Sequence, residues 1–303
     1  MTAYESRFIT PPTEQEEVYP YRRVWPSLII ENGVLFAVVI ILFLVTRFIT
    51  IPDRLHLPIG VGLCVVPVAL WLVVSYYRER LVTQPREKLL LVAIIGALTA
   101  NAVGLPLVHD VLQVEQWLSL QSAVNRIVGY TFTLGLVQAI LTYLILRYLV
   151  WPDHFRSRFD SIAYGAAHAT GYAVVTNLNF ILSANPAPDI AAMTIFDNSV
   201  VLQITGMLVG YGLAEVRFTI QPMILFLTGS VAFASLVSGI AVPIRSGLSN
   251  ASLSSLINVS STRPILGFLF SAALFAGISF ILAFLLNTAQ RRDLEAAAED
   301  ENL

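Results

Sequence analysis

The sequence predicts an all-α fold, a polytopic transmembrane helix bundle of about eight spans with both termini in the cytoplasm (N-in and C-in). Three observations lead to this prediction: the composition, the length of the apolar stretches and the placement of Lys and Arg. Of the 303 residues, 56% are hydrophobic and 13% are charged, and the mean hydropathy is +0.73. Soluble domains carry about 25% charged residues, so a water-soluble fold of this composition would expose apolar surface that it could not cover.

Long apolar stretches recur along the chain. A helix needs about 20 mostly apolar residues to cross a bilayer, and none of the stretches alternates with the period of two that is typical of a membrane β-barrel. The expected spans are Leu28–Ile49, Leu57–Tyr77, Leu89–Leu112, Ile127–Val150, Ser161–Leu182, Asn198–Phe218, Ile220–Ile244 and Pro264–Leu286.

The basic residues predict the orientation, because Lys and Arg concentrate in cytoplasmic loops. If the N-terminus is inside, most of the 18 Lys and Arg residues fall on the cytoplasmic side. An odd number of spans would break this alternation, so the charge bias supports the count as well as the orientation. The least secure connection is the sixth to the seventh span, where only a tight turn near Arg217–Thr219 is available.

The flanking segments and the overall charge define the domain organisation. We expect a cytoplasmic N-terminal segment at 1–26, a transmembrane bundle at 27–287 and a cytoplasmic tail at 288–303. The first segment lacks the apolar core of a cleaved signal peptide. The net charge of −2 with dispersed basic residues gives no nucleic-acid signature. The single cysteine, Cys64, excludes an intrachain disulfide and a cysteine-based metal cluster.

Polar side chains inside the predicted spans are the first functional lead, because lipid penalises them unless they face protein or water. No Asp, Glu, Lys or Arg lies at the centre of a predicted span, which argues against a proton- or sodium-coupled pump. Uncharged polar residues share helix faces on the fourth and fifth spans. They form either interhelical hydrogen bonds or a polar cavity; the candidates are Gln138, Thr142, His168, Tyr172, Thr176 and Asn179.

Small residues at four-residue spacing predict close contacts between helices. Gly206 and Gly210 form a GxxxG pattern, and Gly165 and Ala169 repeat the spacing on the fifth span. Such residues let two helix backbones approach closely. We interpret both pairs as packing inside the bundle.

Two motifs around the start of the fifth span carry a family resemblance. Residues 159–165 read Phe-Asp-Ser-Ile-Ala-Tyr-Gly, and residues 171–177 read Gly-Tyr-Ala-Val-Val-Thr-Asn. They resemble the Phe-Asp-Gly-x-x-Tyr-Gly and Gly-Phe-Ala-x-x-Glu-Asn stretches of the PrsW family of intramembrane proteases, in the CAAX-protease-like superfamily. The resemblance implies a PrsW-like core at about 127–218. Asp160, in the first motif, fits the N-cap of a helix.

The residues that carry the chemistry of the family are replaced in this chain. The resemblance implies a Glu-Glu-x-x-Lys motif where Gln138, Ala139 and Thr142 stand, and a Glu where Thr176 precedes Asn177. A later His is expected near Val201–Gln203 and is absent there. General acid–base catalysis needs groups that exchange protons near neutral pH, and these side chains do not. The resemblance therefore implies a degenerate member, and we expect no catalytic residue, bound metal or cofactor; the degenerate family positions are Gln138, Ala139, Thr142, Thr176, Asn177 and Gln203.

Three functional hypotheses follow. The leading one is a PrsW-like pseudoprotease of the cell membrane, in the bacterial inner membrane, that acts as a scaffold, a binding protein or a complex subunit. Its expected partners are the lipid bilayer and other membrane protein subunits, and no nucleic acid. The first alternative is an active intramembrane peptidase with an altered site, in which His168 is the base and Asp160 or Asn177 assists. The second alternative is a transporter or channel.

Overall fold

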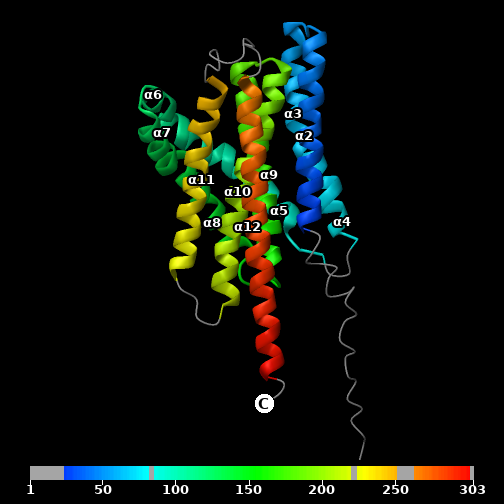
Figure 1. Cartoon of the computed structure of the whole chain (residues 1–303), viewed down its shortest axis with the longest axis vertical. Coiled ribbons are helices and arrows are strands. Elements are labelled where there is room, and N and C mark those ends of the chain that lie inside the picture. The colour runs from blue at the N-terminus through cyan, green and yellow to red at the C-terminus, as the bar shows by residue number, and fades with distance from the viewer. Residues whose placement is uncertain (1–23, 82–84, 220–223, 251–262, 301–303) are drawn as a thin grey trace, which may run out of the picture.

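The computed structural model describes residues 24–81, 85–219, 224–250 and 263–300, and every regular element in these ranges is a helix (Figure 1). The first four spanning units run to Leu149, and several of them are interrupted by π-helical turns. They comprise α2 (Val24–Phe48); η1 (Asp53–Leu55), α3 (His56–Trp71), η2 (Leu72–Tyr76) and α4 (Tyr77–Glu79); α5 (Leu89–Thr99), η3 (Ala100–Gly104) and η4 (Leu107–Val111); and α7 (Ala123–Tyr130), η5 (Thr131–Gly135) and α8 (Leu136–Leu149).

The remaining helices are longer and mostly uninterrupted. They are α9 (Arg158–Ala184), α10 (Pro188–Phe218), α11 (Ile224–Asn250) and α12 (Arg263–Asp300), and the short α6 (Val114–Leu118) precedes α7. Seven helical units in the described residues are long and apolar enough to cross a membrane. The chain is therefore a polytopic helical membrane protein, as its composition predicts.

Helix α9 corresponds to the fifth predicted span, and it differs from the other seven. Its 27 residues extend about 40 Å, which is long enough to cross a bilayer, but it is not among the apolar helices. The physical reason is its position: α9 packs against α3, α5, α8 and α10, and its residues from Arg158 to Ala173 are almost all buried. A helix that protein shields from lipid does not need an apolar surface.

Helices α9 and α10 form the centre of the bundle. In α10, 83% of the most apolar stretch is buried inside the protein, against about a third or less in the other six apolar helices. Figure 1 shows α12 in front of this pair, α2 and α3 at one side and α11 with α7 at the other. The first turn of α2 and the last turns of α12 lie at the same end of the bundle (Figure 1), as an even number of crossings requires.

Glycines allow the central helices to touch backbone to backbone. A Cβ atom on Gly165 of α9 would lie 2.2 Å from the carbonyl oxygen of Gly206 in α10, and one on Gly210 would lie 2.3 Å from that of Ser161. The prediction that these glycines pack inside the bundle is confirmed.

Several predicted boundaries shift in the structure. Helix α11 continues past Ile244 to Asn250, and the tail is helical to Asp300. Residues 1–23 and 220–223 lie outside the described residues, and Arg217 and Phe218 of the predicted turn are still helical. Asp160 is the third residue of α9 and Ser157 is its N-cap, so the prediction that Asp160 is the N-cap was wrong by one helical turn. The carboxylate still caps the helix, because it accepts hydrogen bonds from the backbone N–H of Arg156 (2.8 Å) and Ser157 (2.7 Å).

Candidate functional site

A cavity of about 210 Å³ lies between η3–η4, α6–α8 and helices α9, α10 and α11. Two of the degenerate family positions, Gln138 of α8 and Thr176 of α9, line it together with Val201 of α10, which lies in the stretch Val201–Gln203 where the later His is expected; Gln203 itself does not line it. They come from three helices that are far apart in the sequence. The other polar residues on the wall are His109, Tyr130, Tyr172, Asn198 and Arg245, and the rest of the lining is mostly aliphatic.

The candidate cavity residues divide into three groups. Gln138, Tyr172 and Thr176 line the cavity. His168 and Thr142 are buried behind it, with 1% of each residue exposed, and the Nδ1 atom of His168 lies 3.2 Å from the Thr142 hydroxyl. Asn179 is exposed on the outside of the bundle. Asn179 therefore faces away from the cavity, although Asn177 and Ile181 on neighbouring turns of α9 are fully buried.

The other family positions make structural contacts away from the cavity. Asn177 is fully buried; its amide nitrogen donates to the Ser199 hydroxyl (3.3 Å) and its amide oxygen accepts from Asn198 (3.0 Å). Gln203 accepts a hydrogen bond from the Asn32 side chain of α2 (2.8 Å). Ala139 belongs to the main apolar cluster. These three side chains connect helices rather than face a ligand.

The structure separates His168 from the groups that would assist it as a base. Asp160 lies eight residues earlier on α9, which is about 12 Å along the helix axis. Both carboxylate oxygens of Asp160 already accept hydrogen bonds, and the Asn177 amide is bound to α10. Within the described part of the chain, the only hydrogen bond of the His168 ring is the contact with Thr142.

The cavity wall does not fit a divalent metal ion. Protein sites for such ions use carboxylates, thiolates or several imidazoles at short range. The described residues contain no group of three or more His, Cys, Asp or Glu side chains that could hold one. The cavity offers amides, hydroxyls, one imidazole and the guanidinium of Arg245, and a fixed positive charge opposes the binding of a cation.

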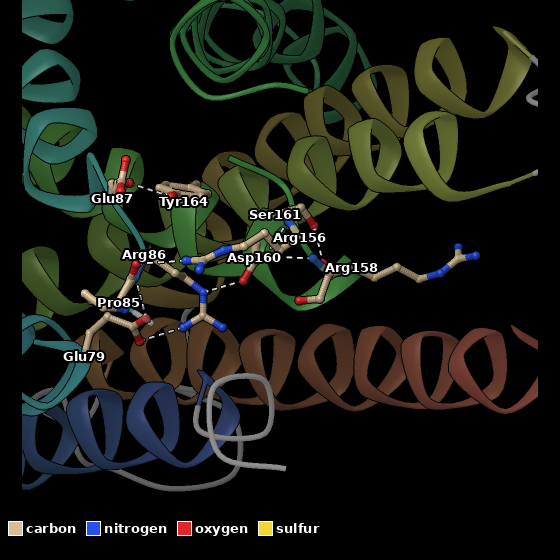
Figure 2. Close-up of polar contacts among 10 residues, drawn as sticks. Glu79, Pro85, Arg86, Glu87, Arg156, Arg158, Asp160, Ser161 and Tyr164 are labelled. Carbon is tan, nitrogen blue, oxygen red and sulfur yellow. Dashed lines mark hydrogen bonds and ion pairs between the residues drawn. The ribbon is translucent and has the colours of Figure 1, made fainter. Parts of the chain in front are cut away.

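A second polar cluster, the charged clasp, lies at the start of α9 and is formed by Glu79, Arg86 and Asp160 (Figure 2). The Arg86 Nε atom donates to Asp160 Oδ1 (2.6 Å), and its Nη1 atom donates to Glu79 Oε2 (2.7 Å). The Arg86 and Asp160 side chains are only 3% and 2% exposed. A buried charge is strongly destabilising when its partner is lost, so the clasp fixes α4 and the segment before α5 to the base of α9.

Neighbouring contacts extend the clasp (Figure 2). The Arg156 guanidinium donates to the carbonyl oxygen of Pro85 (2.8 Å), and the Tyr164 hydroxyl donates to that of Glu87. On the other side, Arg158 of α9 pairs with Glu215 of α10 at 2.6 Å. Asp160 and Tyr164 are the Asp and Tyr of the motif at 159–165, which explains physically why the motif needs these residue types.

Four polar residues of the cavity wall were not predicted from the sequence: His109, Tyr130, Asn198 and Arg245. Arg245 follows the predicted seventh span directly and was assigned to a loop. Arg245 could have been found from its four-residue spacing to Ala241, because this spacing places both residues on one helix face if the helix continues past Ile244. Asn198 stood at the predicted start of its span, whereas α10 begins ten residues earlier, at Pro188.

Comparison with protein-family models matches residues 84–229 to the family described as PrsW family intramembrane metalloprotease. The match includes the predicted core at 127–218, the clasp residues Arg86 and Asp160, and the cavity positions of α8, α9 and α10; Arg245 lies beyond it. Comparisons with curated proteins and with solved structures gave no match. Over residues 84–229, just under half of the chain, the protein is similar to the PrsW family of intramembrane metalloproteases.

Proposed function

We propose that this protein is a PrsW-family membrane protein without protease activity, and that its cavity binds a ligand or partner instead of cleaving it. We place it in the cell membrane, in the bacterial inner membrane, as a binding protein or a subunit of a membrane complex. One observation carries the proposal: Gln138, Thr176 and Val201 meet on one cavity wall, where the family resemblance leads us to expect two carboxylates and a histidine.

The chemistry of these side chains supports the proposal. A metalloprotease needs a metal ion that activates a water molecule and a group that moves its proton. An amide and a hydroxyl donate and accept hydrogen bonds but do not take up a proton near neutral pH, and a guanidinium does not lose one in proteins. A wall of this kind can hold a ligand. Its one imidazole, on His109, can exchange a proton, but a single imidazole does not make a metal ligand set.

The alternative of an altered peptidase site has less support. It requires His168 to work with Asp160 or Asn177, and the contacts of both residues direct them elsewhere. His168 also lies behind the cavity wall.

The test is a cleavage assay on the full chain in liposomes that contain a set of membrane-spanning peptides. Mass spectrometry would detect new peptide ends. We expect no more cleavage than in empty liposomes, and no change for His168→Ala or Gln138→Ala. Cleavage by the unaltered protein that disappears in Gln138→Ala would overturn the proposal, because it would place hydrolysis in this cavity.

A further inference from the structure

Helix α11 brings a positive charge to the cavity from outside the family-matched region. The helix continues to Asn250, and Ala241, Val242 and Arg245 on its last turns all line the cavity. The guanidinium therefore lies on the same wall as the three positions whose family residues are replaced. The charge that the wall presents to a ligand is positive.

The hydrogen-bonding capacity of Arg245 is only partly used. Its Nη1 atom makes both of its polar contacts, to the Asn198 side-chain oxygen at 3.1 Å and to Asp197 Oδ2 at 3.6 Å. A guanidinium has five N–H donors; within the described residues, its Nε and Nη2 atoms donate to no protein group. The Arg245 side chain lines the cavity and is 23% exposed, so donors remain that a ligand in the cavity can use.

The remaining wall limits the size and character of the ligand. A volume of about 210 Å³ has room for a small molecule and is too small for a helix about 10 Å wide. The same cavity is also lined by aliphatic side chains, among them Leu105, Val108, Leu134 and Leu202. The wall therefore suits a small charged head attached to a short apolar body.

We propose that this cavity binds the carboxylate or phosphate head of an amphiphile on Arg245, with the apolar part of the molecule against the aliphatic wall. The planar fork of Arg matches two oxygens of such a head through Nε and Nη2. The inference rests on the proposed function, since it assigns a ligand class to the same cavity. The head can belong to a membrane lipid or to a free fatty acid, which share this chemistry.

The test measures octanoate and octyl phosphate binding to the full chain in nanodiscs by calorimetry, with empty nanodiscs as the baseline. We expect Arg245→Gln to lower the affinity for both ligands at least tenfold, and Arg245→Lys to lower it less. Octanol, which has no charged head, should bind wild type and Arg245→Gln with the same affinity. The matched control is Arg54→Gln, which removes an exposed Arg of η1 and should change nothing. Equal affinities of wild type and Arg245→Gln for octanoate would overturn the inference.

Further measurements distinguish loss of binding from misfolding and identify the molecule that supplies the charged head. Leu202→Trp fills the cavity and leaves Arg245 in place, so it should also abolish binding while the variant elutes as a folded protein. Inorganic phosphate that binds as tightly as octyl phosphate would contradict the apolar half of the site. Release of a co-purified anionic lipid by octyl phosphate would identify the bilayer as the source, and binding without release would identify a free amphiphile. Peptide cleavage would overturn the proposed function without affecting these affinities, so the two failures are distinguishable.

Discussion

At the scale of single residues, Asp160 links local structure to the long-range contacts of the family motif. One oxygen accepts from Arg86, which is 74 positions earlier in the sequence, and the other accepts from two backbone N–H groups at the start of α9. The same carboxylate thus caps a helix and neutralises a buried guanidinium. Its position near the helix start could be predicted from the local sequence. Its partnership with Arg86 could not, because Arg86 lies between two other predicted spans, far away in the sequence.

Replacing Asp160 with Asn should destabilise the protein by about 3 kcal/mol or more, because Arg86 would lose one of its two buried counter-charges. Thermal unfolding of the purified protein in detergent measures the effect as a lower midpoint. Asp153→Asn is the control, because Asp153 is exposed in the loop before α9 and its charge should not matter. Equal midpoints for the two variants would show that the clasp does not stabilise the fold.

At the scale of elements, α9 is the helix whose surroundings differ most from those of its neighbours. Length and apolar character were sufficient to predict the other spans. Six of these helices have most of their apolar stretch outside the protein interior, and α10 is apolar although most of its apolar stretch is buried. Helix α9 was predicted as a span as well, but its lower apolarity follows from contacts with α5 and α10 that periodicity alone does not reveal. The end of α11 was predicted too early. A charged residue after an apolar run usually indicates a loop, but Arg245 is still helical.

The contact between α9 and α10 depends on the absence of side chains at their crossing. We expect Gly165→Ala to cost about 1–3 kcal/mol of stability, because the new methyl group would lie 2.2 Å from the Gly206 carbonyl oxygen. Gly277→Ala on α12 is the matched control, since no atom lies within 4 Å of its added Cβ. Denaturant titration of both variants measures the difference; a Gly165→Ala variant as stable as Gly277→Ala would refute the close approach.

At the scale of the whole molecule, the even number of crossings and the charge distribution predict the same topology, with both termini on the cytoplasmic side. The start of α2 and the end of α12 lie at one end of the bundle (Figure 1). We therefore expect reporters fused to the N- and C-termini to be protected on the same, cytoplasmic, side in intact cells. Protease or impermeant-label accessibility distinguishes the two sides. One accessible and one protected terminus would contradict the eight-crossing topology.

The cavity is also a property of the whole molecule, and the sequence predicted it only in part. The helix faces of Gln138, Tyr172 and Thr176 were visible in the sequence spacing, but periodicity does not show how deep each residue lies. Gln203 illustrates the limit: it is two residues from Val201, yet its side chain contacts α2 while Val201 lines the cavity. Which of two neighbouring positions faces the site is decided by packing between helices.

The divalent-metal content of the full chain tests most directly whether this cavity kept the family geometry and lost its chemistry. Wild type, purified with zinc present and then dialysed, should retain far less than one ion per chain. Gln138→Glu, Thr176→Glu and Val201→His combined should gain about one, and the same variant with Gln203→His in place of Val201→His should gain none. About one tightly held ion per wild-type chain, lost in Gln138→Leu, would contradict a cavity that binds without a metal.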